Sequence, residues 1–224
     1  MSPEQVQSLV REIERKDLST AAHTWRVVLY ARALVEEAGV DRDLIERITH
    51  AAALHDVGKI DIPDEILQKP GRLTPGEFEV IKRHAALGYD RLRAMGETDP
   101  VVLGFVRHHH ERWDGAGYPD GLRAEEIPIG PRFFTVIDSF DAMTSHRPYR
   151  HNVGEGAALR ALDELEAGAG TRYSPDAVAV FTNLVRAGAV DHVLQHFNDD
   201  DPDLPRYCGG PATRALLEST RRAR

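Results

Sequence analysis

The chain has little of what several protein classes require. It contains one cysteine, Cys208, which excludes an internal disulfide and a cysteine-rich zinc site. It contains no run of about eighteen apolar residues, so no membrane span is expected. Residues 1–16 are polar and charged and have no apolar region typical of a signal peptide. We therefore expect a cytoplasmic protein that does not bind a membrane.

A surplus of positive charge is also missing. The 28 Lys and Arg residues face 36 Asp and Glu residues, which makes the formal net charge −8. An acidic protein repels a long polyanion unless basic groups gather locally, so a nucleic-acid polymer is not expected as a partner. A small phosphate ligand remains compatible with this charge, because a few local cations or a metal can bind it.

Strand patterns are nearly absent, whereas helical periodicity is frequent. Thr74, followed by Pro75 and Glu77, has the pattern of a capping box. Gly39 and Gly58 stand where a helix is expected to end in a left-handed residue. The predicted helices cover about residues 4–16, 20–38, 42–57, 74–95, 99–110, 132–145, 154–167 and 174–187. The pattern predicts an all-α fold.

One domain with an appendage at each end is expected. Residues 1–16 are predicted to form an N-terminal helix packed on the main domain, which covers 17–196. Residues 111–131 are rich in glycine and proline and are predicted to form a long ordered loop, a kind of segment that is often functional. Residues 197–224 are predicted to form a poorly ordered C-terminal tail.

Histidine is the residue whose placement points to chemistry, with 11 in the chain. The pair His55-Asp56 stands in the apolar stretch AALHDVGKI, where a buried charge must be paired or bind a metal. A lone pair of this kind is more often a hydrogen-bonded core histidine. Further imidazoles and carboxylates, however, stand on the expected inner faces of other helices: His23, His84, His109, His110 and Asp138. Helix bundles build dinuclear metal sites from such sets, and these ligands suit iron, manganese or zinc.

The order of His23, His55-Asp56 and Asp138 resembles the HD phosphohydrolase superfamily. Three segments resemble its HD-GYP subfamily, which is named after the motif at residues 117–119: HDVGKIDIPDEILQKPGRLT, HHERWDGAGYPDGLRAEEIP and DSFDAMTSHRPYR. The resemblance covers residues 17–187. It implies an all-α, HD-domain helical bundle with a long ordered GYP loop, and it makes the main domain the catalytic one. It also implies hydrolysis of cyclic di-GMP to linear pGpG, in some members on to GMP.

The resemblance further implies a role for individual residues. The implied metal ligands are His23, His55, Asp56, His84, His109, His110 and Asp138. The implied substrate-binding residues are Lys59, Tyr118, Arg147 and Arg150. His55, Asp56 and Lys59 are the expected catalytic residues, with Asp56 bridging two divalent cations, iron or manganese. His108 is expected to be an outer neighbour of the ligands. Protein partners are expected to bind through the GYP loop, and the oligomeric state stays open.

Two positions depart from the family pattern. Some members bind a third metal through a glutamate four residues before the first histidine, and here Ser19 occupies that position. We therefore expect two metals. Ala124 stands where glycine is usual, which leaves the local loop conformation open.

Several alternatives stay open at this point. Lys59 is either a phosphate ligand or a lysine that caps a helix end, and Arg147 and Arg150 bind either substrate or surface carboxylates. Asp141 is expected either to orient a metal ligand or to pair with an arginine or a helix end. The alternative functions are hydrolysis of another cyclic dinucleotide or nucleotide, and a catalytically weak module that senses a cyclic dinucleotide.

Overall fold

The structure, a computed structural model, describes residues 1–17, 21–145 and 156–196. Ser19, Arg147, Arg150 and the predicted tail at 197–224 lie outside the described residues. The described elements are α1 (Pro3–Asp17), α2 (Ala21–Glu37), α3 (Arg42–Ala53), η1 (Val57–Asp61), α4 (Asp64–Leu67), α5 (Pro75–Lys82), α6 (His84–Ala94), α7 (Pro100–His108), η2 (Ala124–Glu126), α8 (Ile129–Thr144), α9 (Ala157–Ala167), α10 (Pro175–Arg186) and α11 (Asp191–His196). No strand forms among these residues, so the all-α prediction is confirmed.

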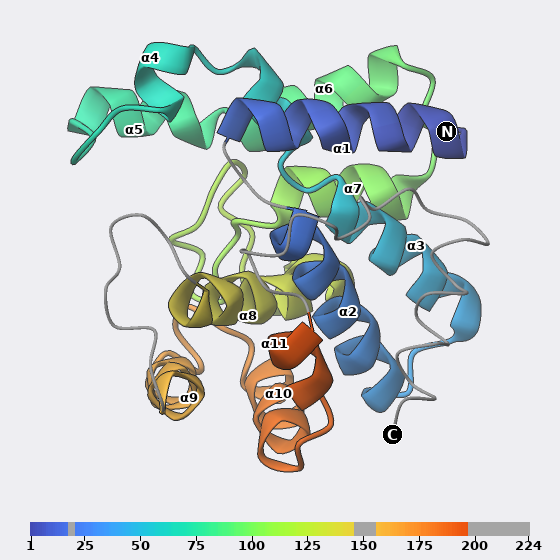
Figure 1. The fold of residues 1–224 in the computed structure, drawn as a ribbon, viewed down its shortest axis with the longest axis vertical. Helices are drawn as coiled ribbons and strands as arrows, with labels where there is room; N and C mark the ends of the chain where they lie inside the picture. The colour runs from blue at the N-terminus through green and yellow to red at the C-terminus, as the bar shows by residue number, and fades with distance from the viewer. Residues whose placement is uncertain (18–20, 146–155, 197–224) are drawn as a thin grey trace.

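Helix α2 runs through the core and packs on α3, α8 and α10 (Figure 1). Its Tyr30 ring packs edge-to-face on Phe140 of α8 and Phe181 of α10, each with ring centroids 5.7 Å apart. All three rings are fully buried. Because burying one such side chain stabilises a fold by roughly 1.5–3 kcal/mol, this cluster ties the three helices together.

A second layer contains α1, α4, α5 and α6, at the top of the view in Figure 1. Helix α1 buries Val6, Leu9, Val10 and Ile13, the apolar face that its periodicity predicts, and packs on η1. Within the described residues, no helix is both long and apolar enough to cross a bilayer. The predicted domain limits stay a prediction.

The two glycines that were expected to end helices differ. Gly39 has φ +71°, as expected for a left-handed helix end. Gly58 does not have a positive φ, so that prediction is wrong. A Cβ atom at Gly58 would lie 1.9 Å from the His84 carbonyl oxygen and 2.4 Å from the Gly88 nitrogen. Glycine is needed at position 58 because the backbone of α6 packs directly against it.

Two helix boundaries also differ from the prediction. The capping box at Thr74 forms, but the single helix predicted from there is two helices, α5 and α6, separated at Arg83. The helix predicted to include His55 and Asp56 ends at Ala53, so this pair lies in the turn between α3 and η1. Neither break has a proline or a helix-ending glycine in the sequence to mark it. Helix α11 was not predicted.

Candidate metal centre

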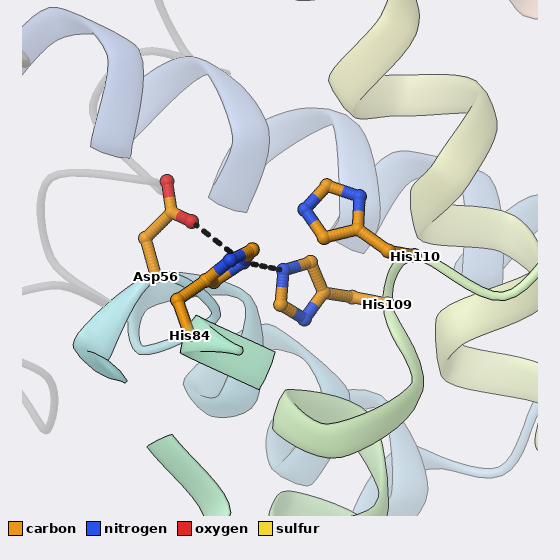
Figure 2. Close-up of side chains that lie close together, drawn as sticks. All are labelled: Asp56, His84, His109 and His110. Carbon is orange, nitrogen blue, oxygen red and sulfur yellow. Dashed lines mark hydrogen bonds and ion pairs between the residues drawn. The ribbon is translucent and has the colours of Figure 1, made fainter. Parts of the chain in front are cut away.

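Two groups of possible metal ligands meet at Asp56. One group contains Asp56, His84, His109 and His110, and the other contains His23, His55 and Asp56. Within each group the ligand atoms all lie within 4.8 Å of one another. Figure 2 shows the first group, with its side chains turned toward one another. The turn after α3, the start of α6, the end of α7 and helix α2 therefore bring six of the seven predicted ligands together.

Backbone carbonyls orient three of these histidines. The Nδ1 atom of each lies 2.7–2.8 Å from the carbonyl oxygen three residues earlier, which belongs to Ala52 for His55, to Ile81 for His84 and to Val106 for His109. A carbonyl oxygen only accepts, so each Nδ1 donates its proton. When such an imidazole is neutral, its Nε2 atom carries the lone pair, which is the form that binds a metal.

The Nε2 atoms of His84 and His109 lie 3.1 Å apart, and a dashed line in Figure 2 marks this contact. Burial lowers the pKa of both side chains, and neighbouring histidines lower that of His109 further. Burial and the nearby His84 also lower the pKa of His110 to about 3. Near neutral pH these imidazoles are uncharged, so lone pairs face one another in a buried site. A divalent cation among them removes this repulsion, and the residues therefore fit a metal.

A side chain, not a carbonyl, orients His23. Its Nδ1 donates to Asp141 Oδ2 at 2.8 Å, and the Arg26 Nε donates to Asp141 Oδ1 at 2.5 Å. The Ser145 hydroxyl lies 3.0 Å from Asp141 Oδ2. Burial alone would raise the pKa of Asp141, but His23 and Arg26 outweigh it and the pKa is lowered. Asp141 thus orients a candidate ligand and pairs with an arginine, so both roles left open by the sequence occur.

The two oxygens of Asp56 face different groups. Its Oδ2 lies 3.0 Å from His55 Nε2, and its Oδ1 lies 3.5 Å from His84 Nε2. Burial would raise the pKa of Asp56, but the charges of His55 and Lys59 outweigh it and hold the pKa well below its usual range. A carboxylate that is ionised and turned toward two ligand groups has the geometry needed to bridge two cations.

Lys59 lies between two carboxylates. Its Nζ donates to Asp56 Oδ2 and to Asp17 Oδ2, each at 2.7 Å. Burial lowers the pKa of Lys59, but these carboxylates outweigh it and raise the pKa above its ordinary value. Lys59 is therefore a charged group beside Asp56, and its second partner comes from the end of α1.

Asp138 belongs to neither ligand group among the described residues. It lies half-buried on α8. Its negative charge favours the protonated forms of His55 and His110, which places it near both. The structure therefore brings Asp138 beside the cluster, but not to the spacing of a ligand.

Tyr118 of the GYP loop packs on the ligand cluster, with its ring 4.9 Å from the His110 ring. Burial and the charge of Asp56 raise the pKa of Tyr118, so its hydroxyl stays protonated. His108 lies outside both ligand groups and pairs with Asp120 Oδ2 at 2.9 Å, as expected for an outer neighbour.

A buried carboxylate fixes the GYP loop. Glu111, which is 1% exposed, accepts hydrogen bonds from the backbone of Asp120, Gly121 and Leu122 at 2.8–3.1 Å. A Cβ atom at Gly117 would lie 2.3 Å from the Arg112 nitrogen, so the loop can pass there only with glycine. The loop is thereby attached to the residues that directly follow His109 and His110.

A family model described as HD domain matches residues 7–177 of the chain. The chain belongs to the HD domain family. A cyclic di-GMP phosphodiesterase of Thermotoga maritima is 42% identical over 190 residues, which cover 84% of this chain and 50% of that protein. A 3′3′-cGAMP-specific phosphodiesterase 2 of Vibrio cholerae is 35% identical over 178 residues, which cover 79% of this chain and 34% of that protein. This HD-domain chain therefore spans half or less of the length of these relatives.

A solved structure of a cyclic GMP-AMP-specific phosphodiesterase from Vibrio cholerae has the same fold. The TM-score is 0.62 at 16% identity, and the match covers 99% of this chain and 59% of that chain. The names of the sequence relatives agree with the resemblance to HD-GYP phosphodiesterases that the motifs indicate.

Two residues of this HD domain were missed by the sequence analysis. Asp17 is the last residue of an amphipathic helix, and nothing local points to its contact with Lys59. Glu111 had a weak signal, since it directly follows His109-His110 and begins a loop rich in glycine. A carboxylate at that position has many backbone N–H groups within reach.

Proposed function

We propose that this HD domain is a phosphodiesterase that hydrolyses cyclic di-GMP to linear pGpG with two divalent cations, iron or manganese. The observation that carries the proposal is the pair of ligand groups that share Asp56. When bound, two such cations neutralise a phosphodiester and lower the pKa of a water molecule so that it can attack phosphorus.

Each of the two ligand groups would bind one cation. His23, His55 and Asp56 would bind one cation, and Asp56 with His84, His109 and His110 would bind the other. Asp56 would serve both through its separate oxygens. Asp138, which lies near His55 and His110, would complete the set if its side chain turned toward them.

Lys59 would act on the substrate and not on a metal. Once Asp56 binds cations, it attracts the Lys59 ammonium less, while Asp17 keeps the ammonium nearby. Lys59 could then contact a non-bridging phosphate oxygen as charge develops there. The protonated hydroxyl of Tyr118, whose ring packs beside His110, would donate to the substrate. Substrate binding by Arg147 and Arg150 stays a prediction.

One relative is named a 3′3′-cGAMP-specific phosphodiesterase, which makes a mixed cyclic dinucleotide the second candidate. With two metals, and Ser19 in place of a glutamate, we expect the linear product to be cleaved more slowly than the cyclic substrate. On this basis pGpG accumulates before GMP.

Metal analysis of protein purified without oxygen or chelator, followed by chromatography of the products, tests the proposal. We expect two equivalents of iron or manganese, and pGpG from cyclic di-GMP at a higher kcat/KM than linear product from 3′3′-cGAMP. The reverse preference would assign the second candidate substrate. A metal-loaded protein that binds but does not cleave either dinucleotide would instead be a sensor. Folded protein without metal would contradict the proposed centre. Partners at the GYP loop and a cytoplasmic location stay predictions.

A further inference from the structure

A row of side chains leads from the ligand cluster to the exposed face of α5. The Tyr118 ring lies 4.9 Å from the His110 ring and 6.4 Å from the His84 ring, between centroids. The Lys82 Nζ lies 5.7 Å from the centre of the Tyr118 ring and 5.6 Å from the centre of the Phe78 ring. The row therefore joins the GYP loop to α5, and its outer end is Phe78.

Phe78 is unusual because its side chain is 48% exposed. Only three large hydrophobic side chains are exposed in the described part of the chain, and the other two, Met95 and Leu159, are not members of this row. An aromatic ring left in water gives up the stabilisation that its burial would provide. A ring so close to a candidate active site is therefore well placed to be covered by a ligand.

The short backbone connection between α5 and α6 keeps the Phe78 ring near the ligand cluster. Helix α5 ends at Lys82, and α6 begins at His84, with Arg83 alone between them. Phe78 and Lys82 stand four residues apart and share one face of α5. Phe78 and Lys82 precede the candidate metal ligand His84 by six and two positions, which limits how far from it they can lie.

Lys82 has an exchangeable partner. Its Nζ pairs with Glu79 Oε1 at 2.6 Å, and the Glu79 side chain is 67% exposed. Because an exposed ion pair contributes little, a phosphate can replace Glu79 at small cost. The Phe78 side chain is 48% exposed even with the ammonium beside it, so part of the ring is open to a base. An aromatic plane beside a cation is the arrangement by which proteins bind single-stranded nucleotides.

We infer that Phe78 and Lys82 form an outer subsite for the half of a cyclic dinucleotide that is not being cleaved, in which Phe78 stacks on the base and Lys82 binds the second phosphate. This inference rests on the proposed function. The subsite lies away from the reacting phosphorus, so it should affect how tightly the dinucleotide binds and not the chemical step.

Steady-state kinetics of paired variants test the subsite. Phe78→Ala is compared with Phe78→Tyr, which keeps a ring, and Lys82→Gln is compared with Lys82→Arg, which keeps the charge. Leu159→Ala removes an even more exposed apolar side chain, on α9, and serves as the control. The substrates are cyclic di-GMP and methyl p-nitrophenyl phosphate, a phosphodiester without a base. All five changes lie on the surface or half-buried, so folding should be retained.

We expect Phe78→Ala and Lys82→Gln each to raise KM for cyclic di-GMP about tenfold, with kcat and the rate on the small diester unchanged. The Tyr, Arg and Leu159→Ala variants should stay within about twofold of wild type. A KM within about twofold of wild type in both test variants would overturn the subsite, and would favour a protein partner at this surface. A wild-type protein that cleaves the small diester but neither cyclic di-GMP nor 3′3′-cGAMP would instead overturn the proposed function, and the subsite with it.

Discussion

The ligand cluster has two sides, and His23 on one side is oriented differently from His84 and His109 on the other. On the α2–α8 side, His23 donates to the Asp141 side chain, which Arg26 binds in turn. On the α6–α7 side, His84 and His109 donate to backbone carbonyls. The orientation of His23 therefore depends on replaceable side chains, whereas the orientation of His84 and His109 follows from the folded backbone.

The two sides also differ in charge. Burial lowers the pKa of His84, His109 and His110 on the α6–α7 side. Burial acts in the same direction on His55, but the Asp56 carboxylate 3.0 Å away outweighs it and raises the pKa of His55. The α6–α7 side thus offers neutral lone pairs, and Asp56 supplies negative charge between the two sides. Variants that act on one side, on both or on neither can separate these contributions.

Asp56→Ala acts on both sides and should have the largest effect. Because Asp56 is the residue common to both ligand groups, we expect loss of metal from both and a fall in kcat on the order of 10³-fold or more. Asp56→Asn keeps the side-chain volume and should show most of the same loss, which separates charge from shape. Metal analysis and product chromatography measure both quantities. Wild-type turnover with full metal occupancy would show that Asp56 is no bridge.

Lys59 belongs to neither ligand group, so Lys59→Ala keeps every candidate ligand and should spare the metals. If Lys59 contacts phosphate in the transition state, kcat should fall about 30- to 1,000-fold, the range for about 2–4 kcal/mol, with near wild-type metal content. Asp17→Asn removes only the second partner of Lys59 and should reduce kcat less. An unchanged rate in Lys59→Ala would leave this lysine only a structural role, between α1 and the turn after α3.

Local features of the fold were predictable from the sequence. The apolar spacing of α1 and the capping box at Thr74 were correctly predicted, because both depend on residues within one or two turns of helix. The left-handed conformation of Gly39 is local in the same way. The six clustered candidate ligands were singled out because histidine and aspartate are unusual in apolar stretches and because their motifs resemble a known family.

Features that depend on distant contacts were not predictable. Asp17 and Lys59 are 42 positions apart, and their ion pair exists because α1 packs on η1. Gly58 was assigned to the wrong cause, since its lack of a side chain serves the approach of α6 and not its own backbone angles. The break at Arg83 likewise has no signal in the nearby sequence.

Asp141→Asn acts on the α2–α8 side alone. An amide cannot accept hydrogen bonds from both His23 and Arg26 as a carboxylate does, so His23 should lose its fixed orientation. We expect the affinity for one of two metal equivalents to fall about 10- to 100-fold while the other stays near wild type. Stepwise metal titration measures this, with Ser145→Ala as the control that keeps the carboxylate. Equal weakening of both equivalents would mean that the two sides are not independent.

Acid should weaken the α6–α7 side through His110. The pKa of His110 is about 3 in the folded protein, against 6.5 for the free side chain. The unfolded chain therefore takes up the proton first, and stability present above about pH 6.5 is lost as the pH falls toward 3. Between pH 7 and pH 5 this residue should remove about 2 kcal/mol from the free energy of unfolding of the metal-free protein.

Urea unfolding in chelator at the two pH values tests this contribution. Between pH 7 and pH 5 the free energy of unfolding of His110→Asn should fall by about 2 kcal/mol less than that of wild type. His55 should act with the opposite sign, because its raised pKa makes its contribution largest at low pH. Equal losses in wild type and His110→Asn would show that His110 is not held in its neutral form.

Ala124→Gly acts on the loop beside the α6–α7 side and should have the smallest effect. Ala124 has φ +49°, the left-handed region that favours glycine, so the loop keeps this conformation although a side chain is present. That conformation costs a residue with a side chain roughly 1–2 kcal/mol of stability, which glycine avoids. The greater freedom of glycine in the unfolded chain lowers the stability of the variant by about 0.5–1 kcal/mol. Ala124→Gly should therefore raise the free energy of unfolding by about 0.5–1 kcal/mol.

The same substitution at Ala116, which is exposed in the same loop and has no positive φ, is the matched control and should lower the free energy of unfolding by a similar amount. Both variants should keep wild-type turnover, because Glu111 fixes the loop through backbone groups at 120–122 and not through either alanine. If urea unfolding shows that the two substitutions change the free energy of unfolding in opposite directions, the strain is confined to Ala124. Changes in the same direction would mean that residues other than Ala124 determine the loop conformation. A change in turnover would show that the loop backbone, like that of α6 and α7, positions the candidate ligands.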